Sequence, residues 1–234
     1  RNQSNPDRHD SQSQAGSIRS RNLLIGSVVA ALVVAGIWML LFSSKATQPS
    51  PPATTNSAAA LASEHSPMLG AADARVHIVE FLDPACAACA TMHAEVKRLL
   101  ALYPDKVRLT TRHVAFRDGS DHAIKVLEAA KRQGKYWQTL EALYAAQSSW
   151  VVDNLVQPAK VWRAVEHVGL NAEQLKSDFN DPEVESRLNQ DMRDARLLRV
   201  AESPKFFVNA RPVPGAGANP LHMLVTERLR AEYG

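Results

Sequence analysis

The most prominent pattern in the chain is an uncharged, apolar run of twenty residues, from 23 to 42. A helix of that length rises about 30 Å, which matches the hydrocarbon thickness of a bilayer. Arg19 and Arg21 precede the run and Lys45 follows it, so the positive-inside tendency predicts a cytoplasmic N-terminus. We therefore predict a single transmembrane anchor, with everything beyond it exported. The alternatives are a buried core helix and a cleaved signal peptide, whose hydrophobic region is shorter, at about 7–15 residues.

The segments on either side of this run are polar. Residues 1–22 carry too little apolar surface to fold alone, and we predict a disordered cytoplasmic tail. Residues 43–65 are rich in Ser, Thr, Ala and Pro, which is typical of a flexible linker. A coil of this length separates its ends by ~25–30 Å on average. We therefore expect residues 66–234 to form a domain that is held near the membrane.

A globular pattern begins after residue 65. Residues 76–82 (VHIVEFL) are mostly apolar and β-branched, which predicts a strand covered on both faces. Apolar residues then recur at helical spacing over residues 86–103, and a second strand candidate covers residues 107–116. Strand, helix and strand follow one another with short joints. This order predicts a β-α-β unit with two parallel strands.

The rest of the chain predicts a helical block followed by a hairpin and a last helix. The block extends from about residue 120 to 198, with helix starts expected at Asn171 and Asp181. Residues 206–214 predict a closing hairpin, and Asn219 is expected to cap the final helix before a proline. Together these elements predict an α/β fold with a helical insertion, preceded by the single transmembrane helix.

Composition and charge narrow the range of functions. Hydrophobic residues make up 45% of the chain, which allows a sizeable core. The net charge of +3 first suggests an acidic partner, but the charge is unevenly spread. Five of the 27 basic and three of the 24 acidic residues lie in residues 1–65, which leaves 22 and 21 in the predicted domain. A nearly neutral domain gives no sign of a basic face for a phosphate backbone, so we expect no nucleic-acid partner.

The chain has only two cysteines, Cys86 and Cys89, at the predicted junction of strand and helix. Two thiols this close cannot brace a fold, but they can form a reversible disulfide. Unpaired N–H groups and the helix dipole favour a thiolate there and lower the pKa of such cysteines. We expect Cys86 to be the more exposed thiol and therefore the nucleophile, with Cys89 as the resolving thiol.

A metal site is the main alternative for these two thiols. Structural zinc normally needs four ligands, and the nearby His77, His93 and His113 form no recognisable second pair. A Cu(I) site that uses Cys86 and Cys89 alone stays open, because soft thiolates suit Cu(I). We favour redox chemistry with no metal and no other cofactor.

Glu80 is an acid within the apolar strand, on the same face as Ile78 and Leu82. Burial among aliphatic side chains disfavours a carboxylate and raises its pKa. We predict that Glu80 accepts and returns the proton of Cys89 during exchange. The alternative is a glutamate that is paired in a salt bridge or exposed at an edge.

These motifs together resemble the DsbA-type thioredoxin-like proteins. The resemblance rests on residues 70–96, which hold Glu80 and the Cys86-Ala87-Ala88-Cys89 motif, and on Ser203-Pro204 with the strand that follows. It covers roughly residues 66–234. It implies that Pro204 is cis and lies against Cys86, that Ser203 makes backbone contacts to a bound peptide, and that Glu80 matches the family's buried acid.

The sequence departs from the family pattern at three places. Strongly oxidising members often have Pro-His where this chain has Ala87 and Ala88, so a stabiliser of the thiolate is missing. Ser203 replaces the more usual Thr or Val before the proline. The hairpin turn reads Asn209-Ala210 where Asn-Gly is preferred, because both positions need a positive φ.

Taken together, the sequence predicts a thiol–disulfide oxidoreductase anchored in the bacterial inner membrane, with its catalytic domain in the periplasm. Its partners would be exported protein thiols or disulfides. A membrane redox partner, either a quinone-linked oxidase or a transmembrane electron donor, would reset the cysteine pair. The oxidase direction is slightly favoured over the reductase direction. The alternative function is copper handling by the same two thiols.

Overall fold

The computed structural model describes residues 60–61, 63–215 and 217–234. The predicted tail (1–22), the predicted anchor (23–42) and most of the predicted linker (43–65) lie outside these residues. Within the part that is described, no helix has the length and apolar character that a membrane crossing needs.

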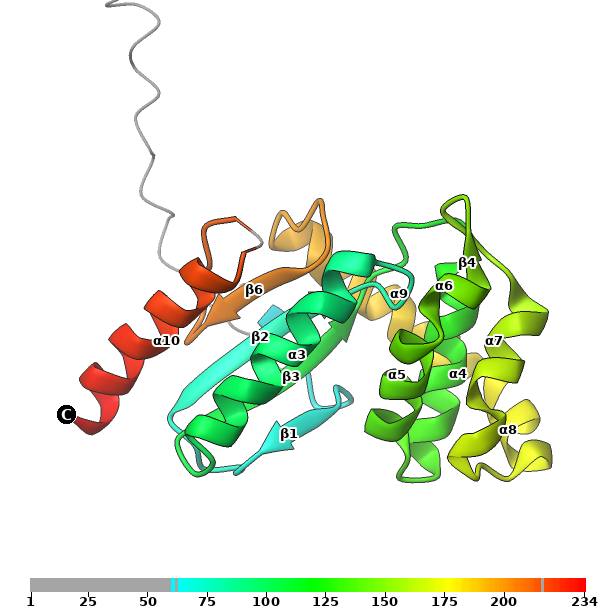
Figure 1. Cartoon of the computed structure of the whole chain (residues 1–234), viewed down its shortest axis with the longest axis horizontal. Coiled ribbons are helices and arrows are strands. Elements are labelled where there is room, and N and C mark those ends of the chain that lie inside the picture. Colours follow the sequence, from blue (N-terminus) through cyan, green and yellow to red (C-terminus); the bar gives the residue numbers. More distant parts are fainter. Residues whose placement is uncertain (1–59, 62, 216) are drawn as a thin grey trace, which may run out of the picture. The chain divides into compact units, whose positions relative to one another are not determined.

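A five-stranded sheet forms the centre of the domain, with the strand order β1-β3-β2-β6-β7 (Figure 1). The predicted parallel pair is confirmed: β2 and β3 run side by side from Val76↔Val107 to Leu82↔His113. The other strands pair antiparallel to their neighbours, and the predicted closing hairpin is formed by the last two. The bounds are β1 (Met68–Gly70), β2 (Val76–Leu82), β3 (Val107–His113), β6 (Lys205–Val208) and β7 (Arg211–Pro212).

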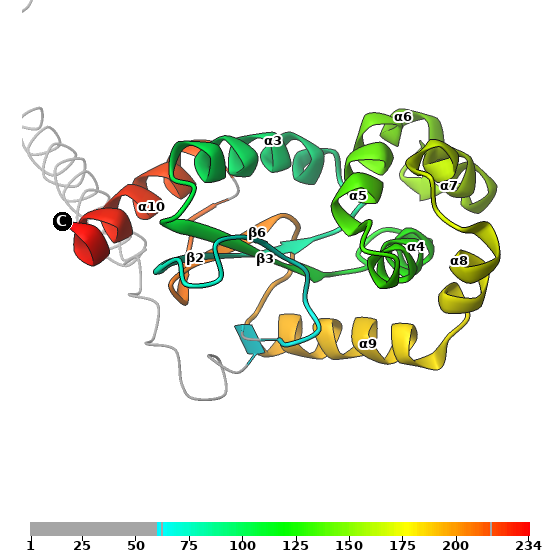
Figure 2. The same ribbon diagram turned by 90° about the horizontal axis from the view of Figure 1, so that it is seen from below.

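Helices cover both faces of this sheet, as Figure 2 shows: α3 (Ala87–Leu102) and α10 (Ala218–Tyr233) lie on one face and α9 (Pro182–Leu197) on the other. The alternation of side chains along β2 decides what each face buries. Ile78 packs towards Val96 of α3, whereas Phe81 packs in a separate cluster with Ala195 of α9. Burial on both faces explains why β2 reads as an almost continuous apolar run.

The predicted helical insertion is present between β3 and β6. Its elements are α4 (Ser120–Arg132), α5 (Tyr136–Ala145), α6 (Gln147–Trp150), the short strands β4 (Val151–Val152) and β5 (Leu155–Val156), α7 (Pro158–Val165), the 3-10 turn η1 (Glu166–Val168), α8 (Ala172–Phe179) and α9. The β4–β5 hairpin was not predicted. Trp150 is fully buried in the cluster that holds both cysteines, and its Nε1 donates to the Leu143 carbonyl at 2.8 Å. The insertion therefore packs directly against the cysteine-bearing turn.

Two of the three predicted helix N-caps are confirmed, and the third is wrong. The Asn171 side chain accepts from Gln174 N at 2.9 Å, and Asp181 accepts from Glu183 N at 2.8 Å. The cap expected at Asn219 is wrong, because α10 already begins at Ala218 after Gly217. The first four N–H groups of a helix have no partner within it, so a proline at position 220 does not force a later start.

Two other boundaries differ from the sequence expectation. The second strand ends at His113 rather than Phe116, because the backbone N–H of Phe116 turns away from the ladder and donates to Asp83. The packed domain also begins before residue 66. Leu61 is buried against the α9 face, and Lys131 Nζ donates to the His65 carbonyl at 2.5 Å.

The closing hairpin has the turn that its sequence was predicted to need. Asn209 and Ala210 have φ values of 45° and 64°, which is the left-handed region required at both positions of a type I′ turn. The Asn209 side chain accepts from His77 N at 2.7 Å and so ties the turn to β2. Ala210 therefore adopts a positive φ that glycine would adopt without strain.

A buried ion network joins β3 to α9. Arg112 is fully buried, with its Nε 2.8 Å from Asp191 Oδ1 and its Nη2 2.5 Å from Asp194 Oδ2. The Arg112 guanidinium also donates to the Ala60 carbonyl, and the second oxygen of Asp191 accepts from His113 N at 2.8 Å. These bonds compensate the charges that folding removes from water.

Candidate active site

The cysteine pair lies where β2 ends and α3 begins. Cys86 is the N-cap of α3, in an extended conformation (φ −85°, ψ 116°), and Cys89 follows in the first turn. Both are free thiols, and both are buried, at 2% and 0% exposure. The predicted order of exposure therefore holds, although by a small margin. Ala87 and Ala88 between them are exposed and present only methyl groups to solvent.

The loop before β6 brings a second segment onto Cys86. The Ser203–Pro204 peptide bond is cis, as the family resemblance implied. The Cys86 thiol donates to the Ser203 carbonyl across 3.2 Å. This contact belongs to the thiol form and is lost when Cys86 deprotonates. Residues more than a hundred positions apart in the chain thus meet at one sulfur atom.

Asp83 organises the turn that carries the cysteines, and sequence reasoning missed it. It is fully buried, and its Oδ1 accepts from Ala85 N at 2.9 Å and from Ser120 Oγ at 2.7 Å. Its Oδ2 accepts from the backbone N–H groups of Phe116 and Arg117. One carboxylate therefore joins the β2–α3 turn to the β3–α4 loop. The available signal was an acid followed by proline directly after a buried strand.

The two thiols have opposite electrostatic surroundings. The pKa of Cys86 is lowered to about 5, first by a hydrogen bond from the Cys89 thiol and further by the Cys89 backbone N–H and the positive charge of Arg117, against the effect of burial. The pKa of Cys89 is raised strongly, first by burial and then by the hydrogen bond that it donates to Cys86. One sulfur is thus a thiolate at neutral pH, while the other keeps its proton until a base removes it.

This difference predicts the pH dependence of cysteine modification. In the reduced protein, alkylation by iodoacetamide is expected at Cys86, with a midpoint near pH 5 and a plateau at neutral pH. Mass spectrometry after timed alkylation measures both the site and the rate. The Cys89→Ala variant should shift the midpoint upwards, because the principal stabiliser of the thiolate is removed. A wild-type midpoint near 8.5 would contradict the arrangement.

Glu80 lies under α3, where the sequence placed it. It is fully buried, and neither carboxyl oxygen has a hydrogen-bond partner within the described residues. Burial, and secondarily the charge of Cys86, raise the pKa of Glu80 to about 8. The alternatives of a salt bridge or an exposed edge do not apply. A carboxyl group with this pKa can exchange a proton near neutral pH, which is what a general base or acid needs.

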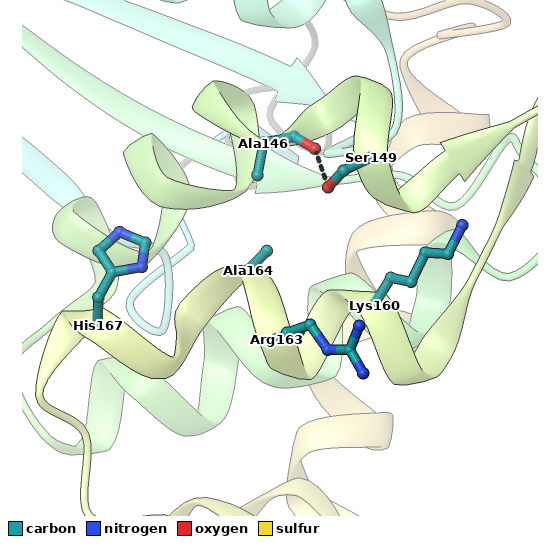
Figure 3. A pocket seen from close by; sticks show the side chains of 6 residues that line it. All are labelled: Ala146, Ser149, Lys160, Arg163, Ala164 and His167. Carbon is teal, nitrogen blue, oxygen red and sulfur yellow. Dashed lines mark hydrogen bonds between the residues drawn. The ribbon is translucent and has the colours of Figure 1, made fainter.

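A basic cleft of about 480 Å³ lies between α6 and α7 (Figure 3). Lys160 and Arg163 of α7 and His167 of η1 line it together with Ser149. It contains neither cysteine. Gln147, next to this lining in α6, donates its amide to the Pro84 carbonyl at 2.8 Å and so connects the cleft wall to the cysteine-bearing turn.

The residues that the structure describes include no group of three or more His, Cys, Asp or Glu side chains placed to hold a metal ion. Cys86 and Cys89 form a pair of soft thiol donors rather than a larger group.

Comparison with known proteins places this site in a family. A family model described as thioredoxin matches residues 62–220, which is more than half of the chain. The chain belongs to the thioredoxin family. A thioredoxin-like oxidoreductase from Silicibacter pomeroyi is 32% identical, with a TM-score of 0.65 over 76% of this chain and 99% of that one. The predicted oxidoreductase class is supported by this relative.

Two further proteins are similar to this chain. α-DsbA1 from Wolbachia pipientis shares the fold, with a TM-score of 0.67 at 16% identity over 76% of this chain and 97% of that one. A probable disulfide bond formation protein D from Bacillus cereus is 28% identical over 65% of this chain and 71% of its own length. The predicted DsbA-type resemblance is thereby confirmed.

Other curated relatives are much longer than this thioredoxin-family chain. The Na(+)/H(+) antiporter NhaA from Herminiimonas arsenicoxydans is 29% identical over 63% of this chain, but the match covers only 23% of that antiporter. The chain therefore spans about a quarter of the length of the antiporters that it matches.

Proposed function

We propose that this protein is a thiol–disulfide oxidoreductase that donates its disulfide to exported polypeptides. The observation that carries the proposal is the position of Cys86 at the N-cap of α3 with Cys89 in the first turn, where the pKa of Cys86 is lowered and Cys89 keeps its proton. A stabilised thiolate favours the reduced form of the pair, which makes the Cys86–Cys89 disulfide a stronger oxidant. Ala87 and Ala88 contribute nothing to this stabilisation. The hydrogen bond from Cys89 and the charge of Arg117 act instead.

In the oxidase direction, a substrate thiolate attacks Cys86 of the disulfide, and the electron pair of the broken S–S bond passes to Cys89. Glu80 gives Cys89 its proton, which leaves a neutral thiol and a mixed disulfide between Cys86 and the substrate. A second substrate thiolate then attacks the substrate sulfur of the mixed disulfide. The substrate leaves oxidised, and Cys86 leaves as the stable thiolate. The backbone of Ser203 and the ring of Pro204 would bind the substrate chain beside Cys86.

The proposed location follows from the apolar run at residues 23–42. Such a span would anchor the protein in the bacterial inner membrane, with the tail of residues 1–22 in the cytoplasm and the catalytic domain in the periplasm. A quinone-linked oxidase in the same membrane would reoxidise Cys86 and Cys89. In the reductase direction, a transmembrane electron donor would take that place.

The reduction potential of the full-length protein decides the direction. Equilibration in glutathione buffers, with thiol trapping, should give a value of about −120 to −180 mV, the range of disulfide donors. A value near about −270 mV would instead mark a reductant. The Cys86→Ser variant is expected to lose all exchange activity in the same buffers, while Cys89→Ser should trap mixed disulfides at Cys86.

Copper handling would use the same two thiols. A Cu(I) titration distinguishes it from thiol–disulfide exchange. Cu(I) added to the reduced protein under a competing chelator should bind no more tightly than to the Cys86→Ser variant if exchange is the function. Tight binding of one Cu(I) that depends on both cysteines would favour the copper function.

A further inference from the structure

The basic cleft between α6 and α7 gathers positive charge along one wall (Figure 3). Lys160 and Arg163 lie three positions apart on α7, and His167 follows four positions later in η1. Residues at this spacing share one face of a helix. None of the residues that line the cleft is acidic. Within the part of the chain that is described, none of these three side chains forms an ion pair with an acid.

This lack of acidic partners contrasts with α4, a neighbouring helix of the same insertion. Every lysine and arginine of α4 is paired with a carboxylate in the structure. The pairs are Lys125 with Glu185, Lys131 with Glu128, and Arg132 with Asp178, Asp181 and Glu183. Cations that line a cleft without acidic partners create a positive potential, which attracts an anion. The cleft wall therefore retains charge that a bound acidic group can neutralise.

The groups on the cleft wall suit a carboxylate. The guanidinium of Arg163 presents N–H donors in the fork that matches the two oxygens of a carboxylate, and Lys160 adds a second cation. The Ser149 hydroxyl donates to the Ala146 carbonyl at 2.6 Å, so its proton is already engaged. The volume of about 480 Å³ falls within the range of about 300–1,000 Å³ that is typical of ligand sites.

The cleft lies within reach of a polypeptide that reacts at Cys86. Gln147 of α6 donates to the Pro84 carbonyl, and Ala164 in the cleft belongs to the same apolar cluster as Cys86. When the steps from Cys86 through Pro84 and Gln147 to Ser149 are laid end to end, the two outer Cα atoms are at most about 20 Å apart. An extended chain covers at most about 3.3–3.6 Å per residue, so about six residues span this distance.

We propose that the basic cleft binds an acidic side chain of the substrate polypeptide, within about six residues of the cysteine that reacts at Cys86. This inference rests on the proposed exchange function and adds a substrate class to it, namely chains with Asp or Glu near the reacting cysteine. Lys160 and Arg163 are the specificity-determining residues. The cleft contains neither cysteine, so these two side chains act on substrate binding and not on the exchange step.

The test uses three cysteine peptides of equal length as probes. They differ only at two positions about five residues from the cysteine, which carry Glu, Gln or Lys. Each peptide reacts with the oxidised full-length protein, and thiol trapping measures the rate. The dependence of this rate on peptide concentration separates the half-saturating concentration from the limiting rate. Dithiothreitol has no charge and is too small to reach the cleft, so its reaction reports on the exchange step alone.

The variants change the charge of the cleft and provide a matched control. Lys160→Gln with Arg163→Gln removes both cations, and Lys160→Glu with Arg163→Glu reverses their sign. The control is Lys176→Gln with Arg196→Gln. It removes the same net charge from exposed side chains in the last turns of α8 and α9. The melting temperature of each variant checks that it is folded.

The half-saturating concentration of the Glu peptide is expected to rise about five- to tenfold in Lys160→Gln with Arg163→Gln, as for two exposed charge contacts. The limiting rate, the Gln peptide and the dithiothreitol reaction should stay within twofold of wild type. The control variant should stay within twofold for all probes. Lys160→Glu with Arg163→Glu should prefer the Lys peptide over the Glu peptide.

Three results would overturn the proposal. The first is a half-saturating concentration for the Glu peptide that does not rise, or that rises equally for the Gln peptide. The second is an equal rise in Lys176→Gln with Arg196→Gln, because the effect would then come from the net charge of the protein. The third is a preference that disappears when phosphatidylglycerol vesicles are added, because the cleft would then bind an anionic lipid surface.

The same measurements distinguish the cleft from the function on which it rests. If the oxidised wild type reacts with none of the three peptides, the exchange function fails and the role of the cleft fails with it. If all three peptides react but the charge of the cleft does not affect their half-saturating concentrations, the exchange function stands and only the cleft is rejected.

Discussion

Replacing Arg112 by leucine is expected to lower the free energy of unfolding by about 3–5 kcal/mol. Arg112 has 0% and Asp191 3% side-chain exposure. Removal of Arg112 leaves the buried Asp191 charge with only His65 and the His113 N–H as partners, which is a costly arrangement for a buried ion. Asp194 loses its ion pair as well and keeps the Gln190 amide as a donor. Leucine keeps much of the buried volume, so the loss reports on charge rather than on a cavity. Urea unfolding monitored by tryptophan fluorescence measures the change.

Two controls make the Arg112 result interpretable. Lys125 pairs with Glu185 at 3.2 Å on the surface, and Lys125→Met should cost less than about 1 kcal/mol, as exposed pairs do. Adding Asp191→Asn to Arg112→Leu should recover part of the loss, because a neutral amide is easier to bury. A double variant that is as unstable as the sum of the two single variants would show that the pair is not coupled.

Replacing Glu80 by glutamine is expected to stabilise the protein at alkaline pH while it slows exchange. The folded-state pKa of Glu80 is about 8, above the ordinary value of 4.5. The stability that this group contributes is therefore fully present below pH 4.5 and is lost as the pH rises through 8. The loss amounts to about 5 kcal/mol at 1.36 kcal/mol per pKa unit, as an order of magnitude.

Glutamine does not titrate, so the variant should lack this decline. Its stability relative to wild type should rise by several kcal/mol between pH 5 and pH 9, when both reduced proteins are unfolded in urea. The buried amide carries its own constant cost of about 1–3 kcal/mol, which does not change with pH. Exchange should slow about 10²-fold, as expected when a general acid or base beside Cys89 is removed. Parallel pH profiles of stability for the two proteins would rule out the raised pKa of Glu80.

Local chemistry predicted the parts of the fold that depend on neighbours in sequence. β2 has the predicted limits, 76–82, because a strand buried on both faces needs a continuous apolar run, and such a run is visible in the sequence. The caps at Asn171 and Asp181 were predictable for the same reason, since each side chain bonds two or three residues ahead. The positive φ of Asn209 and Ala210 followed from the requirements of the turn.

The sequence did not reveal contacts made between distant segments. Asp83 bonds to groups 33 to 37 residues away, so its partners could not be read from the sequence, although an acid before a proline at the end of the strand marks its position. The pairing of Arg112 with Asp191 spans 79 residues and appears in the sequence as two ordinary charges. β1 has only three residues, too few to show a period. Glu80 was found because an acid in an apolar strand is conspicuous.

The two outer strands of the sheet affect whether other polypeptide chains can pair with its edges. β1 has three residues and β7 has two, one of which is Pro212 without an N–H group. A long open edge strand exposes a row of unpaired backbone N–H and C=O groups, with which a strand of another chain can pair. Short edge strands, or edge strands that contain proline, prevent this pairing. An oxidoreductase with the proposed substrates would meet such segments often. Short edges would let it bind such chains beside Cys86 without adding them to its own sheet or promoting their aggregation.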